Sequence, residues 1–246
     1  METKKGCVEC FFQQGITLSE RLNLDKNLRD EIQKEIKIIV ESLTFNEIPA
    51  EVGRKIYHMI SDKTGIKDPY QNIKKNNIEH ALSLLPELEE KIINAKEPLL
   101  LAVKYAVAGN IIDFGIGKDF DILDEFHDIE ETPFAIDDYN IFREKLEKAE
   151  TVLYIGDNAG ESVFDGLLIK YLNKPVSFIV RSGPIINDVI YEDAVLSGIE
   201  KYAKIISSGM DAPGTILHLC SKEFNELFRK SDFIISKGQG NFEGLS

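Results

Sequence analysis

Apolar side chains in the first half of the chain recur three and four positions apart, which is the spacing of one face of an α-helix. The clearest example has its apolar positions at Leu28, Ile32, Ile36, Ile39, Val40 and Leu43. A second helix is predicted after Pro49, and a third after Asp68-Pro69-Tyr70, where a proline fits the first helical turn. The run 98–108 is apolar on nearly every side, which predicts a buried helix. The first half is therefore predicted to be helical.

In the second half of the chain, the spacing of the apolar residues changes. Short apolar runs predict strands at 151–155, 176–180, 203–206 and 233–235. Helical patterns lie between them, and continuous apolar strands that alternate with helices are typical of a parallel sheet covered on both faces. We therefore expect an α/β fold: a Rossmann-like three-layer parallel sheet with a helical N-terminal part. The expected domains are 1–118, helical, and 119–246, which binds metal and phosphate, with the acidic stretch 119–138 as a solvated connection or lid.

Composition narrows the class of protein. The 246 residues include 29 Lys and Arg against 42 Asp and Glu, a formal charge of −13, which disfavours binding to nucleic acid or to anionic membranes. The chain is 43% hydrophobic and 29% charged, as in ordinary folded proteins. It has neither an apolar run of membrane-spanning length nor an N-terminal signal pattern, so we expect a soluble, cytoplasmic protein. A homo-oligomer is compatible with this composition.

Cysteine usage leaves one motif open. The chain has 3 cysteines, which without a secretion signal suggest a reducing compartment. Cys7-Val-Glu-Cys10 is a CxxC, but a structural zinc site normally needs a second pair, and the sequence has none. The motif is therefore either incidental to the fold or a metal or redox site.

Polar residues follow the predicted strands where parallel strands place ligands, at their carboxyl ends. The segments are Gly156-Asp157-Asn158-Ala159-Gly160-Glu161, Asn187-Asp188-Val189 and Lys237-Gly238-Gln239-Gly240-Asn241-Phe242-Glu243. Asp157, Asn158 and Asp188 offer the oxygen ligands that hard divalent ions accept. Lys237 could neutralise a phosphate, and the helix that begins near Gly160 offers an anion seat. Because these residues occur together at the ends of successive strands, they predict a metal-assisted reaction of an anionic substrate.

Each segment alone also has a simpler interpretation. Asp-Asn before a helix is commonly an N-cap, Asn187-Asp188 is a common turn, and a glycine-flanked lysine is often only a solvated loop. The patterns GxGxxG, Walker A, HExxH and GxSxG are absent at the places where they would carry meaning. The 4 histidines have no ligand spacing and are interpreted as structural.

The three segments, in this order, resemble the damage-control phosphatase family. Supporting segments are the CxxC, Asp68-Pro69-Tyr70 and Gly109-Asn110-Ile111-Ile112-Asp113. The resemblance covers nearly the whole chain, and the CxxC together with KGxGNxE is similar to the stand-alone microbial and archaeal branch. Relatives in that family continue beyond the position of Ser246 with a further strand and helix, so we expect less cover over the Lys237 loop.

The resemblance implies a divalent-metal-dependent phosphatase that hydrolyses small phosphorylated metabolites, either sugar phosphates or damaged phosphometabolites, with a metal-activated water. The ion would be Mn, Ni, Co or Mg. The implied metal ligands are Asp157, Asn158 and Asp188, and the implied catalytic residues are Asp157 and Lys237. The implied substrate-binding residues are Asn110, Asp113, Glu161, Lys237, Gly238, Gly240 and Asn241.

Two other functions stay open at this point. One is an S-adenosylmethionine-dependent carboxyl methyltransferase, because a Rossmann-like sheet would accommodate that cofactor. The other is a non-catalytic module that binds a metabolite or senses metal through Cys7 and Cys10. The sequence names neither the physiological substrate nor the preferred metal.

Overall fold

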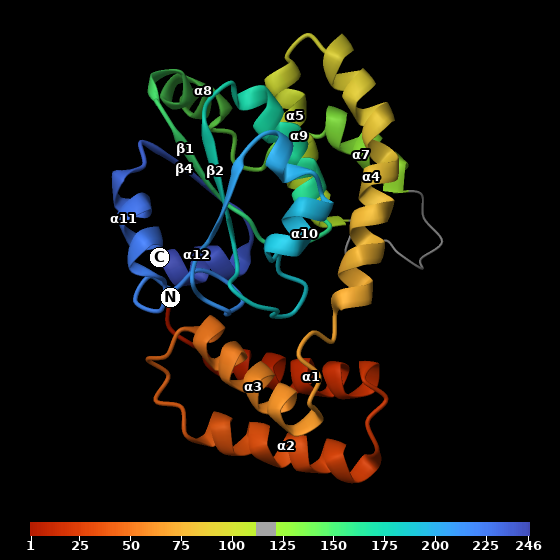
Figure 1. Cartoon of the computed structure of the whole chain (residues 1–246), viewed down its shortest axis with the longest axis vertical. Helices are drawn as coiled ribbons and strands as arrows, with labels where there is room; N and C mark the ends of the chain where they lie inside the picture. Colours follow the sequence, from red (N-terminus) through yellow and green to blue (C-terminus); the bar gives the residue numbers. More distant parts are fainter. Residues whose placement is uncertain (112–121) are drawn as a thin grey trace.

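The computed structural model describes residues 1–111 and 122–246, and Figure 1 draws its elements. Four strands form one sheet: β1 (Val152–Ile155), β2 (Val176–Val180), β3 (Lys204–Ser207) and β4 (Phe233–Ser236). Their order is β3-β2-β1-β4 and every pairing is parallel. The register sets Leu153 opposite Ser177 on β2 and Ile234 on β4. The predicted parallel sheet is confirmed, with each strand within a residue or two of its predicted place.

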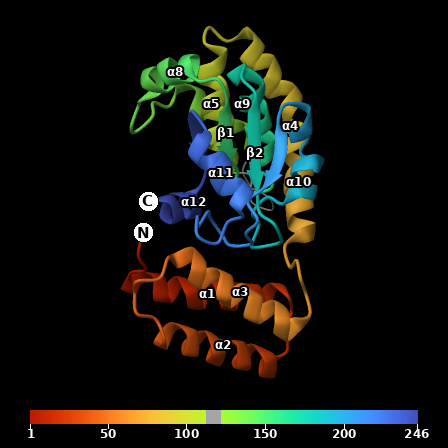
Figure 2. The same cartoon turned by 60° about the vertical axis from the view of Figure 1, so that its left-hand side comes forward.

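Helices cover both faces of this sheet (Figure 2). One face carries α4 (Gln71–Asn94), α5 (Pro98–Ala108), α9 (Ser162–Leu172) and α10 (Tyr191–Leu196), and the other carries α11 (Lys222–Lys230). Along β1, Val152 and Tyr154 pack towards α9, whereas Leu153 and Ile155 pack towards Phe224 of α11. All four β1 side chains are buried, which explains why this strand reads as a continuous apolar run. The predicted three-layer arrangement is confirmed.

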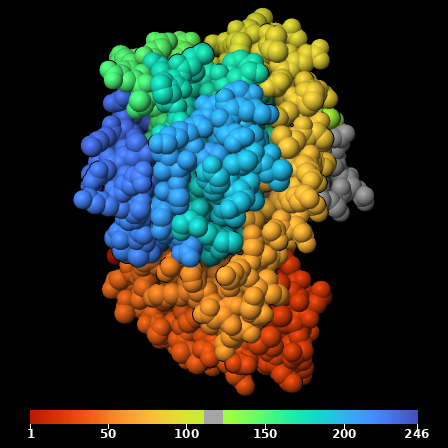
Figure 3. Space-filling model, viewed as in Figure 1, coloured from red at the N-terminus to blue at the C-terminus, as the bar shows by residue number. Residues whose placement is uncertain are grey.

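Three helices form a bundle of their own: α1 (Lys5–Arg21), α2 (Lys26–Glu41) and α3 (Pro49–Thr64). They share a hydrophobic cluster that includes Phe11, Leu18, Ile32, Ile36 and Ile56. The bundle packs directly against the rest of the molecule below the sheet (Figure 3). The helix α1 was not predicted, because Cys, Gln, Gly, Thr and Ser dilute its apolar face. One of these, Gly15, lets α1 approach α2 closely, since a Cβ there would lie 2.0 Å from Ile36 Cδ1.

The helices α4 and α5 share the core of the sheet. Ile78, Leu88 and Tyr105 belong to the same buried cluster as Val152 and the other β1 residue on that face. The division at 118/119 stays a prediction. The α1–α3 bundle has a core of its own, which Tyr70 and Ile185 join, and Ala50 of α3 packs with Met210 and Ile216.

Part of the acidic stretch 119–138 is folded into this core. Its helix α7 (Ile122–Glu131) buries Phe126 completely, between Tyr105 at 5.5 Å and Phe164 at 4.8 Å between ring centroids. Lys104 Nζ also donates to the Glu130 carbonyl at 2.6 Å. The expectation that this stretch is only a solvated connection is therefore wrong for α7.

The remaining elements are short. They are the helices α8 (Tyr139–Lys148) and α12 (Gln239–Leu245) and the 3-10 turns η1 (Gly109–Ile111) and η2 (Ile199–Lys201). The α8 side chain Phe142 packs edge-on against Phe233 of β4, at 5.4 Å between ring centroids. Within the described ranges, no helix has the length and apolar character that crossing a membrane requires.

Candidate active site

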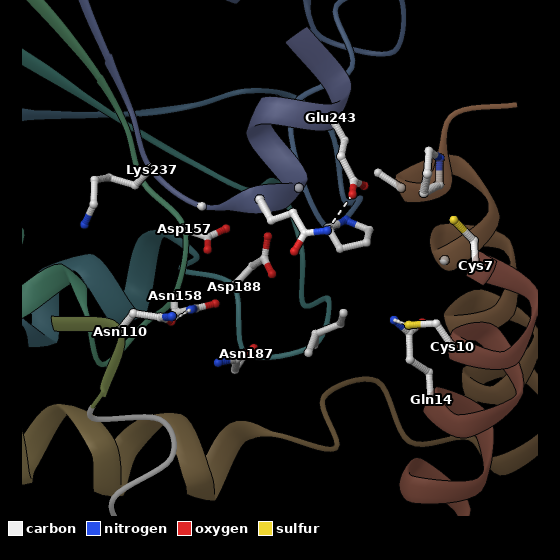
Figure 4. A pocket seen from close by; sticks show the side chains of 18 of the residues that line it. Cys7, Cys10, Gln14, Asn110, Asp157, Asn158, Asn187, Asp188, Lys237 and Glu243 are labelled. Carbon is white, nitrogen blue, oxygen red and sulfur yellow. Dashed lines mark hydrogen bonds between the residues drawn. The ribbon is translucent and has the colours of Figure 1, made fainter. Parts of the chain in front are cut away.

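A cavity of about 680 Å³ lies between the carboxyl ends of the strands and the α1–α3 bundle. Its polar lining on the sheet side comes from Asn110, Asp157, Asn158, Glu161, Asn187, Asp188, Lys237, Gln239 and Glu243, and on the α1 side from Cys7, Cys10 and Gln14 (Figure 4). The strand-end residues predicted from the sequence therefore line one wall of a single cavity.

Backbone hydrogen bonds tie the first two strand-end segments together. The Val189 N–H donates to the Asp157 carbonyl at 2.8 Å, and the Ala159 N–H donates to the Asn187 carbonyl at 2.9 Å. These bonds flank an isolated antiparallel bridge between Asn158 and Asp188. Residues that follow two different strands are thereby held side by side.

The two aspartates face one another, with Asp188 buried and Asp157 half-buried (Figure 4). Asp188 is 4% exposed, and its Oδ2 accepts from Arg181 Nε at 2.8 Å. Asp157 Oδ1 lies 3.9 Å from Arg181 Nη2. Burial raises the pKa of Asp157, and the neighbouring charges of Asp188 and Glu161 raise it further. Burial also raises the pKa of Asp188, against the lowering effect of Arg181.

This donor set fits a hard divalent cation. Asn158 Nδ2 donates to Asn110 Oδ1 at 3.1 Å, which leaves the Asn158 amide oxygen for another partner. Two carboxylates and an amide oxygen are typical ligands of Mg²⁺ or Mn²⁺, and a cation would offset the repulsion between the two neighbouring carboxylates. Within residues 1–111 and 122–246, no group of three His, Cys, Asp or Glu side chains is arranged to hold a metal. The candidate set therefore depends on the amide of Asn158.

The glycine at 238 lets the β4 loop approach the carboxylate of Asp157. Gly238 has φ +83°, and a Cβ there would lie 2.0 Å from Asp157 Oδ2. A side chain at this position would therefore have to push Asp157 aside, whatever the backbone strain.

Lys237 is held at the edge of the cavity by three acceptors. Its Nζ donates to the Ala106 carbonyl at 2.8 Å, to Asp165 Oδ1 at 3.0 Å and to the carboxylate of Glu161. Burial alone would lower the pKa of Lys237, but the charges of Asp165 and Glu161 outweigh it and raise the pKa. The lysine is therefore a permanent cation, and all three of its protons are already used.

Comparison with known proteins identifies the family of the chain. The family model "Damage-control phosphatase ARMT1-like domain" matches residues 3–246. The chain belongs to this family. Damage-control phosphatase PH1575 of Pyrococcus horikoshii is 36% identical, and the alignment covers 100% of this chain and 87% of that protein. A damage-control phosphatase of Archaeoglobus fulgidus is 28% identical over 100% of this chain and 88% of its own length.

The fold is also similar to that of a solved structure. The crystal structure of a DUF89 family protein (PH1575) from Pyrococcus horikoshii superposes with a TM-score of 0.89 and 35% identity, covering 100% of this chain and 87% of that one. Membership in the damage-control phosphatase family supports a phosphatase role on damaged metabolites, and the family is generally metal-dependent.

One of the expected substrate-binding residues, Asn241, has other surroundings in this damage-control phosphatase fold. Asn241 is completely buried, and its Nδ2 donates to the carbonyls of Gly156 at 3.0 Å and Lys237 at 2.6 Å. It therefore holds the loop and does not line the cavity. Gly240 does line the cavity, and Asp113 lies outside the described residues.

Sequence reasoning missed two contributors to the site. Arg181 was visible only as one residue of the segment that follows β2, and no sequence spacing relates it to Asp188. The α1 wall was missed because α1 itself was not predicted. Gln14 Nε2 donates to Cys10 Sγ at 3.6 Å, and burial raises the pKa of the Cys10 thiol. The CxxC was the one sequence signal for this wall, and its role stays open.

Proposed function

We propose that this protein hydrolyses phosphomonoesters of small metabolites in a reaction that depends on a divalent cation of the Mn, Ni, Co or Mg type. The observation that carries the proposal is the convergence of two carboxylates, the buried Asp188 and the half-buried Asp157, with the amide of Asn158 in one cavity. Sugar phosphates and damaged phosphometabolites are the substrate class, since a cavity of about 680 Å³ suits a small molecule.

Asp157, Asn158 and Asp188 would hold the cation. When bound, a divalent ion polarises a phosphate oxygen and lowers the pKa of an attacking water. With its carboxylate on the ion, Asp157 would be a poor nucleophile, so we favour attack by water over formation of a phospho-aspartate.

Lys237 would supply the second positive charge. Because its three protons all have acceptors, contact with a phosphoryl oxygen requires the release of one of them. The Ala106 carbonyl is the neutral acceptor of the three, so its exchange costs less than separating Lys237 from a buried carboxylate. Glu161 and Asp165 would thus keep the ammonium in place while it turns towards phosphate.

The test is phosphate release from a panel of sugar phosphates and other phosphomonoesters, with metal-stripped protein and after addition of Mn²⁺, Ni²⁺, Co²⁺ or Mg²⁺. We expect release only with metal, and a loss of at least ~10³-fold in Asp157→Asn and Asp188→Asn, since a catalytic metal is worth several kcal/mol. The matched control is Asp211→Asn, because Asp211 also accepts from an arginine Nε, that of Arg54 at 2.6 Å, but does not line the cavity. Metal-independent release, or full activity in both active-site variants, would overturn the proposal.

A further inference from the structure

Arg181 lies directly behind the candidate metal ligands. It follows β2, and its N–H donates to the Val189 carbonyl at 2.9 Å, so its backbone is fixed to the segment that carries Asp188. Its side chain is 1% exposed, which is rare for an arginine. A guanidinium buried at this position requires compensating partners within the site.

The guanidinium uses its separate nitrogens on different segments of the chain. Nε donates to Asp188 Oδ2 at 2.8 Å, Nη1 to Thr215 Oγ1 at 3.3 Å, and Nη2 to Asn241 Oδ1 at 3.0 Å. Asn241 in turn holds the carbonyls of Gly156 and Lys237. Arg181 therefore joins the segments that follow β2, β3 and β4 directly, and the segment that follows β1 through Asn241. Only the planar fork of an arginine can reach all three partners at once.

The same contacts decide what Asp188 can offer to a cation. The bond from Nε engages Oδ2 and fixes the plane of the carboxylate, so Oδ1, which this bond does not use, is the oxygen better placed to bind a metal. A carboxylate that binds through one oxygen suits small ions such as Mg²⁺ and Mn²⁺, which have a compact shell of ligands. Ca²⁺ prefers more oxygen ligands and often takes both oxygens of one carboxylate.

We propose that Arg181 is a positioning residue that sets both the strength and the selectivity of divalent-cation binding, by restricting Asp188 to a single donor oxygen. This inference rests on the proposed function, because it presumes that Asp188 is a ligand. It predicts a site that favours Mn²⁺ and Mg²⁺ over Ca²⁺ through a residue that touches neither ion nor substrate.

A purely structural role for Arg181 makes a different prediction. If the arginine only compensated the buried charge of Asp188, a lysine would serve almost as well, because it keeps the charge. Arg181→Lys cannot reproduce the three simultaneous contacts, so it separates charge compensation from orientation. The matched control is Arg54→Lys, since Arg54 Nε holds Asp211 by the same kind of contact away from the cavity.

The experiment measures metal binding directly, without substrate. Metal-stripped full-length wild type, Arg181→Lys and Arg54→Lys are titrated with Mn²⁺, and free Mn²⁺ is followed by electron paramagnetic resonance. Ca²⁺ and Mg²⁺ are then added as competitors. Circular dichroism establishes that each variant is folded. Thr215→Val provides a milder second variant, because it removes the partner of Nη1 and the Thr215 bond to Asn241 Oδ1 but keeps the bond from Nε to Asp188.

We expect Arg181→Lys to lower Mn²⁺ affinity by about 10- to 100-fold, as is usual when a residue behind a metal ligand is lost. Ca²⁺ affinity should fall much less, so the preference for Mn²⁺ over Ca²⁺ should shrink by about tenfold. Thr215→Val should shift both quantities in the same direction by less, and Arg54→Lys should shift neither.

Two results would count against these claims in different ways. An unchanged Mn²⁺ to Ca²⁺ preference in folded Arg181→Lys would overturn the inference about Arg181 and leave the proposed function standing. If Arg181→Lys does not fold, an unchanged preference in Thr215→Val has the same meaning. Failure of the wild type to bind Mn²⁺ at all would overturn the proposed function itself.

Discussion

The two walls of the cavity are built in opposite ways. On the sheet wall, Asp188 is held by Arg181, and Lys237 is held by Glu161 and Asp165, and all three of these partners are buried. On the α1 wall, Cys10 is exposed and accepts a weak bond from Gln14. The Oε1 of Gln14 is buried and has no hydrogen-bond partner within the described parts of the chain.

This difference indicates that the two walls have different tasks, catalysis for the sheet wall and substrate recognition for the α1 wall. A fixed wall keeps charged groups in one geometry, which is what catalysis of a charged reaction requires. A wall with an unused acceptor can form its bonds when a substrate arrives. The family chemistry would therefore be carried by the sheet wall, and the choice of substrate by the α1 wall.

The sharpest way to break the sheet wall is Gly238→Ala. The new methyl group would collide with Asp157, so we expect the metal-dependent rate of phosphate release to fall about 10- to 100-fold. The matched control is Gly65→Ala, because Gly65 also has a positive φ, +71°, but has nothing within 4 Å of its Cβ position. The control should lose about 1–2 kcal/mol of stability and no activity. Equal activities in the two variants would mean that the approach of the loop to Asp157 is unimportant.

The repulsion between carboxylates in the sheet wall should lower the free energy of unfolding of the metal-free protein. Because burial and then the charges of Asp188 and Glu161 raise the pKa of Asp157, the folded protein binds this proton more tightly than the unfolded chain does. The contribution of Asp157 to stability therefore falls as the pH rises from about 4 through the raised pKa.

Asp157→Asn removes the charge that destabilises the metal-free folded protein. At pH 7 and in EDTA we expect the variant to melt above the wild type, by roughly 2–4 °C for each kcal/mol relieved, and the gap to close towards pH 4. Thermal unfolding from pH 4 to pH 8 measures it. A variant that is less stable than the wild type at every pH would contradict the idea that the wall stores like-charge repulsion.

The smallest expected effect belongs to the α1 wall. Gln14→Ala removes an acceptor that a hydroxyl or ammonium group of the substrate could use, and one hydrogen bond is worth about 0.5–1.5 kcal/mol. We expect KM to rise about 2- to 10-fold with kcat and Mn²⁺ affinity unchanged. Gln13→Ala on the same helix is the control, because Gln13 is exposed and does not line the cavity. A fall in kcat would instead assign Gln14 to the chemistry.

The sequence allowed much of the sheet wall to be predicted. Asp157 and Asp188 each follow an apolar strand, and parallel strands bring their carboxyl ends to one edge, so the two residues had to come near each other. The strands were recognisable because both of their faces are buried. Local pattern and one rule of topology were sufficient there.

The remainder depends on contacts that no local pattern contains. The partners of Arg181 come from Thr215 and Asn241, and the direction of the Lys237 side chain depends on Glu161 and Asp165. The inward turn of Asn241 could not be read from its glycine-rich surroundings either. These features follow from packing between distant segments.

The central claim is that the sheet wall holds a divalent cation, and anomalous scattering tests it most directly. Crystals of the wild type soaked in Mn²⁺ should give an anomalous difference peak bounded by Asp157, Asn158 and Asp188, and crystals of Asp157→Asn should lack it. A peak at Cys7 and Cys10 instead, or none in the cavity at saturating Mn²⁺, would contradict the claim.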